Sequence, residues 1–340
     1  MVLSCDPFPT THARRAFPCF DEPALKATFE VHLARETWMT SLSKHASPRR
    51  DLCECQEGQE GWVWDRFERS VPMSTYLVAF VVSDFSYPLH QWQRHSLSNT
   101  IRITRAHALS NPFLSTVWAQ PSAIRHAEYV SEVGSKILAF YESYFNVSYP
   151  LPKMDMVAVP DIAVRGMENW ETGQFLYDPD VDSANHKDTL LEVVAHELAH
   201  QWFGNLVTPA GGRPVAQRGI RDFRGLHREA HMQSHLEENG KIHHRETPQS
   251  LRDRQPRDLP SDQRRGWRSH PAEISEIFDR IEYNKGASIV RMMTYFLGES
   301  TFRRGLNSYL NTFAYTNAEQ DDLWEHLTAA AHRDRKLPRA

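Results

Sequence analysis

The sequence predicts an α+β protein in which a run of strands is followed by a mainly helical region. Residues 27–33 alternate apolar and polar side chains, which is the pattern of a strand with one buried face. Residues 62–64, 75–82 and 101–103 are further strand candidates. From about Ser122 the apolar residues recur with the period of a helix instead. The chain therefore changes its dominant secondary structure near residue 100.

This change of period predicts one domain at residues 1–95 and a second at residues 96–340. Helical patterns in the second domain extend from about Ser122, over residues 189–203 and over residues 274–333, and a short apolar segment lies at 156–159. The last helical pattern places one apolar face on Ile289, Met292, Met293, Phe296 and Leu297. An irregular segment at about 211–270 is rich in Arg, His, Gln and Gly and has the composition of a solvated loop.

Composition excludes several classes of protein. The formal net charge of −4 argues against a nucleic-acid partner, because such proteins carry a basic surface. The longest apolar run, residues 76–82, has the length of a buried strand rather than of a membrane span. The amino terminus shows no signal peptide. We therefore expect no membrane anchor in the sequence as written, and its localisation stays open.

The cysteines do not predict a metal site. All four of them, Cys5, Cys19, Cys53 and Cys55, lie near the amino terminus. Cys53 and Cys55 are separated by one residue, whereas thiolate zinc pairs usually have a spacer of two or more. We interpret all four as free cysteines.

The strongest chemical signal is the sequence HELAH at residues 196–200. Two histidines four positions apart on a helix lie on one face and can bind one metal ion. Glu197 between them can take a proton from water at that metal. The alternative is a histidine pair that caps or solvates the helix, and the five residues by themselves leave it open.

Two further motifs flank HELAH. Upstream, RGMENW at residues 165–170 follows the apolar segment 156–159, and Glu168 beside a metal site could bind the free ammonium of a peptide. Downstream, IEYNKGA at residues 281–287 begins a helix, and the hydroxyl of Tyr283 could stabilise an oxyanion. Taken alone, Glu168 is better interpreted as a surface loop carboxylate and Tyr283 as a packing residue.

In this order the three motifs resemble the aminopeptidase N family of gluzincin zinc metallopeptidases. The resemblance extends to the segments ARRAFPCFDEP at 13–23, PMSTYL at 72–77, YPLPK at 149–153 and HELAHQWFGNLVT at 196–208. It covers about two thirds of the chain, and it implies the carboxyl-terminal part of an antiparallel β domain followed by a partial thermolysin-like catalytic domain. Early parts of the β domain and later parts of the family pattern are not matched.

The resemblance implies an exopeptidase that removes the amino-terminal residue of peptides with one zinc ion. His196 and His200 would be zinc ligands, Glu197 the general base and Tyr283 the group that stabilises the transition state. The substrate would be bound by Gly166, Met167, Glu168 and Asn169, with Glu168 on its ammonium group. Relatives of this kind are often membrane-anchored, and homodimers occur among them.

One departure from the family pattern affects the metal. The third zinc ligand of the family is a glutamate nineteen positions after the second histidine, and that position holds Gly219. The segment RPVAQRGIRDFR at 213–224 can be back-translated so that a reading frame one nucleotide later encodes DLWLNEGFATFV, the family's ligand helix. We therefore interpret the segment as a frame-shifted stretch, and we expect weak zinc binding and little peptidase activity.

Three other functions remain open. A relative without activity could bind peptides, since Glu168 is present where the metal ligand is not. The chain could also be a defective gene product, which an incomplete core would cause to aggregate. The nearest enzymatic alternative is a thermolysin-like endopeptidase.

Overall fold

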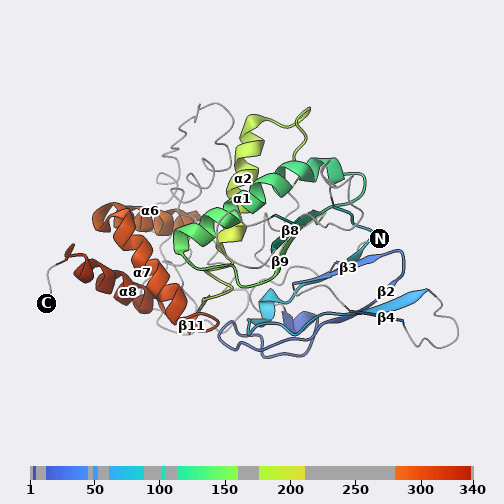
Figure 1. Ribbon diagram of the computed structural model, residues 1–340, viewed down its shortest axis with the longest axis horizontal. Helices are drawn as coiled ribbons and strands as arrows, with labels where there is room; N and C mark the ends of the chain where they lie inside the picture. The colour runs from blue at the N-terminus through green and yellow to red at the C-terminus, as the bar shows by residue number, and fades with distance from the viewer. Residues whose placement is uncertain are drawn as a thin grey trace, which may run out of the picture.

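A computed structural model of the chain describes residues 3–4, 13–44, 49–52, 61–87, 102–103, 113–159, 176–210 and 280–337. Side chains are described for all of these except residues 3–4, 49–52, 102–103, 113–115 and 280–287. The described part combines a small sheet-containing amino-terminal region with a helical region (Figure 1). Among the described residues, no helix has both the length and the apolar character that crossing a membrane requires. The predicted irregular segment at 211–270 lies outside them.

Two antiparallel three-stranded sheets form the amino-terminal region. One has the order β1-β6-β3 and the other the order β2-β5-β4 (Figure 1). Their strands are β1 (Leu3–Ser4), β2 (His32–Glu36), β3 (Thr40–Ser43), β4 (Arg49–Leu52), β5 (Trp62–Arg66) and β6 (Phe80–Ser83).

The inner face of the second sheet holds a buried ion pair. Arg35 on β2 contacts Asp65 on β5, and 3% and 1% of these residues are exposed. The guanidinium also donates to the backbone carbonyl of Met39 at 2.7 Å, and Ser41 donates to Asp65. The opposite face is exposed and carries Trp62 and Trp64. Successive side chains of a strand point to opposite faces, which explains why buried and exposed side chains alternate along these strands.

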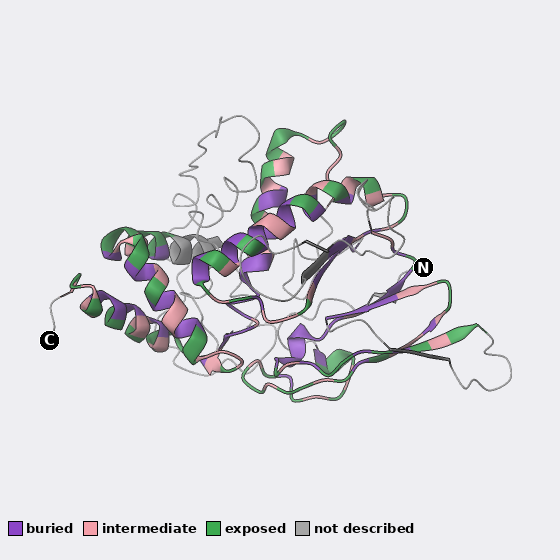
Figure 2. Cartoon of the chain, in the orientation of Figure 1, coloured by how far each residue is buried: buried purple, intermediate pink, exposed green. Residues whose placement is uncertain are grey.

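The central part of the chain forms a third sheet covered by helices. Strand β8 (Phe113–Trp118) pairs with β7 (Arg102–Ile103) in antiparallel and with β9 (Lys153–Val157) in parallel orientation. Helices α1 (Glu128–Phe145) and α2 (Ala184–Ala199) lie next to each other above it (Figure 1). Figure 2 shows that their facing sides are buried. The main hydrophobic core therefore lies under the helix that carries HELAH.

In the carboxyl-terminal region the described residues include three helices. They are α6 (Arg280–Leu297), α7 (Glu299–Thr312) and α8 (Gln320–Arg333). The short parallel pair β10 (Thr208–Pro209) and β11 (Asn317–Ala318) joins this bundle to the segment after α2. On α7, Arg303 and Asn307 donate to the carbonyl groups at the end of α1, at 2.9–3.0 Å. These carbonyls have no partner inside their own helix, so α7 caps α1.

Helices α7 and α8 approach each other at a glycine. A Cβ atom on Gly305 would lie 2.6 Å from Cδ2 and 3.0 Å from Cα of Leu327, so the backbone of α8 would have to move. We expect Gly305→Ala to lower the free energy of unfolding by about 1–2 kcal/mol, because the clash outweighs the better helix propensity of alanine. Urea denaturation measures this.

Gly134 on α1 provides the matched control. Its Cβ would meet only the methyl end of Met156, at 2.6 Å, and this flexible side chain can turn away. We expect Gly134→Ala to cost less than Gly305→Ala. Equal stabilities of the two variants would contradict a backbone contact between α7 and α8.

Several predicted strands have different bounds. The prediction for residues 27–33 is wrong over most of its length, since only residues 32 and 33 belong to β2 and Ala27 makes an isolated bridge with Met73. Residues 75–77 form a 3-10 helix, because the amides of Leu77 and Val78 donate to the carbonyls of Ser74 and Thr75. Strand β8 was not predicted. The helix predicted from about Ser122 begins at residue 128 as α1, and the one predicted at 189–203 is shifted to 184–199 as α2. Within the pattern at 274–333 the described residues form three separate helices.

The predicted apolar face of α6 is also wrong. Leu297 is buried and Met293 packs against the core, but Ile289, Met292 and Phe296 are exposed. The buried face instead includes Val290. Apolar residues therefore surround most of this helix, and their spacing could not identify which face α7 covers.

Candidate metal centre at the end of helix α2

Helix α2 is held at two points before the predicted motif. At its start, the Ser183 hydroxyl accepts a hydrogen bond from the amide of His186 at 3.2 Å, which caps the helix. Near its end, the buried hydroxyl of Tyr141 on α1 donates to the carbonyl of Ala195 at 3.1 Å. The face that packs on the core consists of Leu190, Leu191, Val194, Ala195, Leu198 and Ala199.

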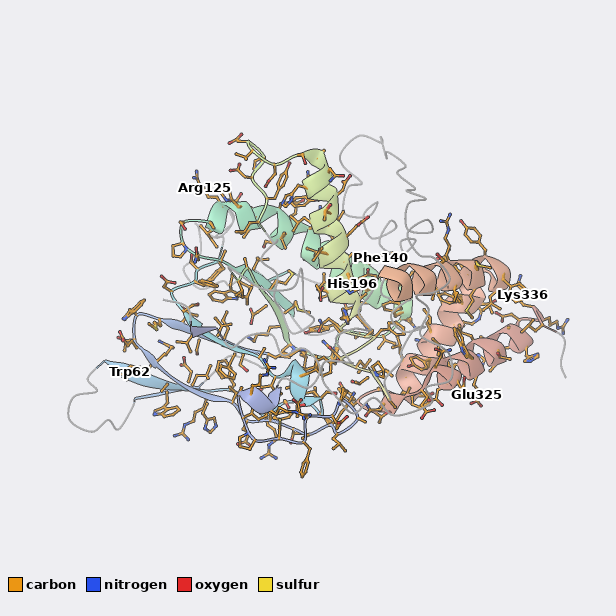
Figure 3. All side chains as sticks on the ribbon, turned by 180° about the vertical axis from the view of Figure 1, so that it is seen from behind. Trp62, Arg125, Phe140, His196, Glu325 and Lys336 are labelled. Carbon is orange, nitrogen blue, oxygen red and sulfur yellow. The ribbon has the colours of Figure 1, made fainter. Side chains whose placement is uncertain are left out.

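The two predicted metal ligands lie together, as the helical spacing requires. Nε2 of His196 and Nε2 of His200 are 3.0 Å apart, and the rings are nearly perpendicular. Two nitrogen ligands of a tetrahedral zinc ion lie about 3.3–3.4 Å apart, given zinc–nitrogen distances of about 2.0–2.1 Å. The pair is therefore close to the geometry that one zinc ion needs. Figure 3 labels His196 near the end of α2.

Burial differs between the residues of the motif. His200 is 6% exposed, while His196 and Glu197 are half-buried. Leu198 and Ala199, in contrast, are in the core. His196 and Glu197 thus keep some exposure on the last turn of α2, whereas His200 is buried at the end of the helix. Here His196 and His200 could hold a metal, and Glu197 lies within the same helical turn as the pair.

The remaining predicted residues are not brought into this site by the described part of the chain. Tyr283 lies in α6, for which only the backbone is described at that position. Gly166, Met167, Glu168, Asn169 and Gly219 lie outside the described residues. Within the described ranges, no group of three or more His, Cys, Asp or Glu side chains could hold a metal ion. The described residues therefore offer two of the ligands of a zinc site, His196 and His200.

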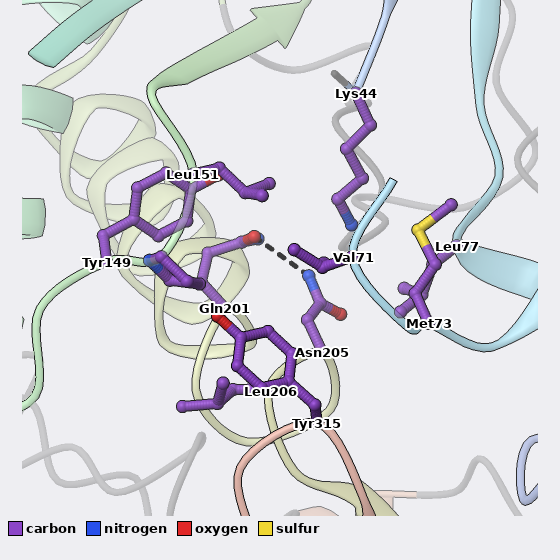
Figure 4. Close-up of a pocket in the computed structure, with 11 residues that line it drawn as sticks. Lys44, Val71, Met73, Leu77, Tyr149, Leu151, Gln201, Asn205, Leu206 and Tyr315 are labelled. Atoms are coloured by element: carbon purple, nitrogen blue, oxygen red, sulfur yellow. Dashed lines mark hydrogen bonds between the residues drawn. The ribbon is translucent and has the colours of Figure 1, made fainter. Parts of the chain in front are cut away.

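A small cavity lies beside the turn that follows α2. Gln201, Asn205 and Leu206 from that turn form one wall, and Lys44, Val71, Met73 and Leu77 of the amino-terminal region face them (Figure 4). Nδ2 of Asn205 donates to Oε1 of Gln201 at 2.9 Å. The cavity has about 30 Å³, which accommodates one or two water molecules and not a peptide. It marks the junction between the two regions of the chain rather than a substrate site.

Comparisons with known proteins agree with the motifs. The peptidase family M1 domain matches residues 129–337, and the peptidase M1 N-terminal domain matches residues 2–77. Aminopeptidase N of Bos taurus is 37% identical over 350 residues, which covers 97% of this chain and 33% of the relative. Endoplasmic reticulum aminopeptidase 2 of Homo sapiens is 37% identical over 338 residues, which covers 96% and 32%.

Endoplasmic reticulum aminopeptidase 1 of Mus musculus is 35% identical over 338 residues, with 96% of this chain and 33% of the relative covered. The chain thus spans about a third of the length of the curated relatives it matches. The M1 domain match extends over more than half of the chain and includes His196, Glu197 and His200. The chain therefore belongs to peptidase family M1.

Proposed function

We propose that this chain is built as a zinc-dependent aminopeptidase with a thermolysin-like catalytic domain, which releases amino-terminal residues from peptides. The observation that carries the proposal is the pair of Nε2 atoms 3.0 Å apart on α2. Family M1 depends on zinc, and the relatives are named aminopeptidases. A single zinc ion would be held by His196 and His200.

Each further role belongs to a named side chain. Bound zinc would supply Lewis-acid polarisation of water and of the scissile carbonyl group. Glu197 takes the proton from the attacking water, and the Tyr283 hydroxyl donates to the oxyanion that develops. Glu168 binds the ammonium group of the substrate, which limits cleavage to the first residue. Gly166, Met167 and Asn169 line the same substrate site.

The sequence as written weakens this activity. Catalytic zinc usually has three protein ligands and one water molecule, and Gly219 has no side chain to serve as the third ligand. We therefore propose weak zinc binding and little hydrolysis. The glycine at position 219 also favours a second candidate function, a peptide-binding relative without activity, because Glu168 is retained.

Metal analysis and two peptides test these proposals. We expect the purified chain to retain far less than one zinc ion per molecule after dialysis against a weak chelator. Near-stoichiometric, tightly held zinc would contradict the weak site. Any residual hydrolysis should require a free amino terminus, whereas cleavage of amino-terminally blocked peptides would indicate an endopeptidase. Peptide binding without cleavage would favour the peptide-binding relative, and aggregation of the purified chain would favour a defective gene product.

A further inference from the structure

The turn after α2 closes the end of the metal-binding helix. The carbonyl groups of His200, Gln201 and Trp202 come after the last helical residue and need donors from elsewhere. The amides of Asn205, Leu206 and Val207 donate to these three carbonyls in order, at 3.0, 3.1 and 3.1 Å. The turn at 204–207 thus holds the backbone of His200 directly.

The carbonyl groups of the same turn accept hydrogen bonds from the amino-terminal region. Nζ of Lys26 lies 3.4 Å from the carbonyl oxygen of Asn205 and 3.3 Å from that of Leu206. The Tyr76 hydroxyl donates to the carbonyl of Gly204 at 3.4 Å. These contacts join residues that are 128–180 positions apart in the chain.

Each of these carbonyls belongs to a peptide group whose amide is one of the donors to the helix end. The carbonyl of Asn205 shares its peptide group with the amide of Leu206, and the carbonyl of Leu206 shares its own with the amide of Val207. A cation on a carbonyl oxygen polarises the peptide group and strengthens the hydrogen bond that its amide donates. Lys26 therefore supports the bonds that Leu206 and Val207 donate to the carbonyls of Gln201 and Trp202, next to the bond that Asn205 donates to His200.

The environment of Lys26 increases this effect. The side chain is half-buried against the turn, and burial lowers the pKa of its amino group to about 8. At pH 7 the group is still mostly protonated, so a poorly hydrated ammonium faces the carbonyl groups.

We propose that Lys26 is a positioning residue for the metal-binding histidines, which it holds in place through the turn at 204–207. The amino-terminal β region then contributes to the metal site without touching the metal. This inference rests on the proposed function, because the position of His200 matters only if the site binds a metal.

The test compares Lys26→Met with Lys26→Arg in the full chain at pH 7. The first variant keeps an unbranched side chain of nearly the same length and removes the charge, while the second restores a cation. Amide hydrogen exchange of a peptide covering residues 201–208 reports on the turn in the metal-free protein. Titration with cobalt(II), followed by its visible absorption, reports on the histidine pair.

We expect Lys26→Met to speed exchange in residues 201–208 about tenfold and to weaken cobalt binding by a similar factor. Lys26→Arg should restore both. Lys136→Met is the matched control, because Lys136 is a half-buried lysine on α1 that pairs with Glu132. This control should match the unmodified chain.

Unchanged exchange and cobalt affinity in Lys26→Met would overturn the proposal. Failure of Lys26→Arg to restore them would also overturn it, because the charge would then not be responsible. If the unmodified chain binds no cobalt, the proposed metal site fails, and the exchange measurement still decides the role of Lys26.

Discussion

Replacing residues 214–225 by the string DLWLNEGFATFV will raise the affinity of the chain for zinc by at least about 100-fold. The string is the one that the shifted reading frame encodes, and this replacement places its glutamate nineteen positions after His200. The Nε2 atoms of His196 and His200 are already 3.0 Å apart, so the glutamate would complete a set of three protein ligands. Loss of an outer-shell partner alone costs about 10–100-fold in metal affinity, and a direct ligand should count for more. Competition with a chromophoric chelator measures the affinity.

The matched control carries the same string with glutamine in place of its glutamate. This variant has the same helix pattern and lacks only the charged ligand, so its zinc affinity should stay close to that of the unmodified chain. A second control, His200→Ala in the restored chain, should lose the gain. Equal affinities of the glutamate and glutamine strings would show that the third ligand does not come from this segment. An intact reading frame across 213–224 in the gene would contradict the frame interpretation itself.

Trp202→Ala will lower the free energy of unfolding by about 3–5 kcal/mol, the range expected for removing a fully buried tryptophan. Trp202 has no exposed surface and packs against Tyr141, Phe145 and Tyr149, with ring centroids 5.4–6.3 Å away. Its Nε1 donates to the carbonyl of Val147 at 2.9 Å, so truncation also leaves this carbonyl without that donor. Urea denaturation followed by far-ultraviolet circular dichroism measures the change.

Trp62→Ala is the control for this second prediction. Trp62 lies on the outer face of the β2-β5-β4 sheet and is 40% exposed. We expect its truncation to cost less than about 1 kcal/mol, as for substitutions away from the core. Similar losses in both variants would mean that Trp202 does not anchor the end of α2 to α1.

The local pattern of the sequence was sufficient where a structure depends on near neighbours. HELAH was predicted to lie on a helix, and its first four residues form the last turn of α2 with His200 as the C-cap. The local pattern was insufficient where a strand pairs with a segment that is far away in the sequence. Strand β8 pairs in parallel with β9, about 40 residues away, and it has no alternation that would have identified it. At 75–77 an apolar run that suits a strand instead forms bonds between residues three apart.

The family follows from residue types at fixed spacings, which need no coordinates, and so do the proposals of two histidine ligands, a glutamate base and a glycine at the third ligand position. What tertiary packing decided is how the helix that carries the histidines is held. Tyr141 binds it from α1, and Lys26 binds the turn behind it from the amino-terminal region. The segment that resembles the family at 13–23 ends before Lys26, and the spacing of the neighbouring residues assigned no role to the lysine. Its partners lie about 180 positions away, and only folding brings an ammonium group against those carbonyls.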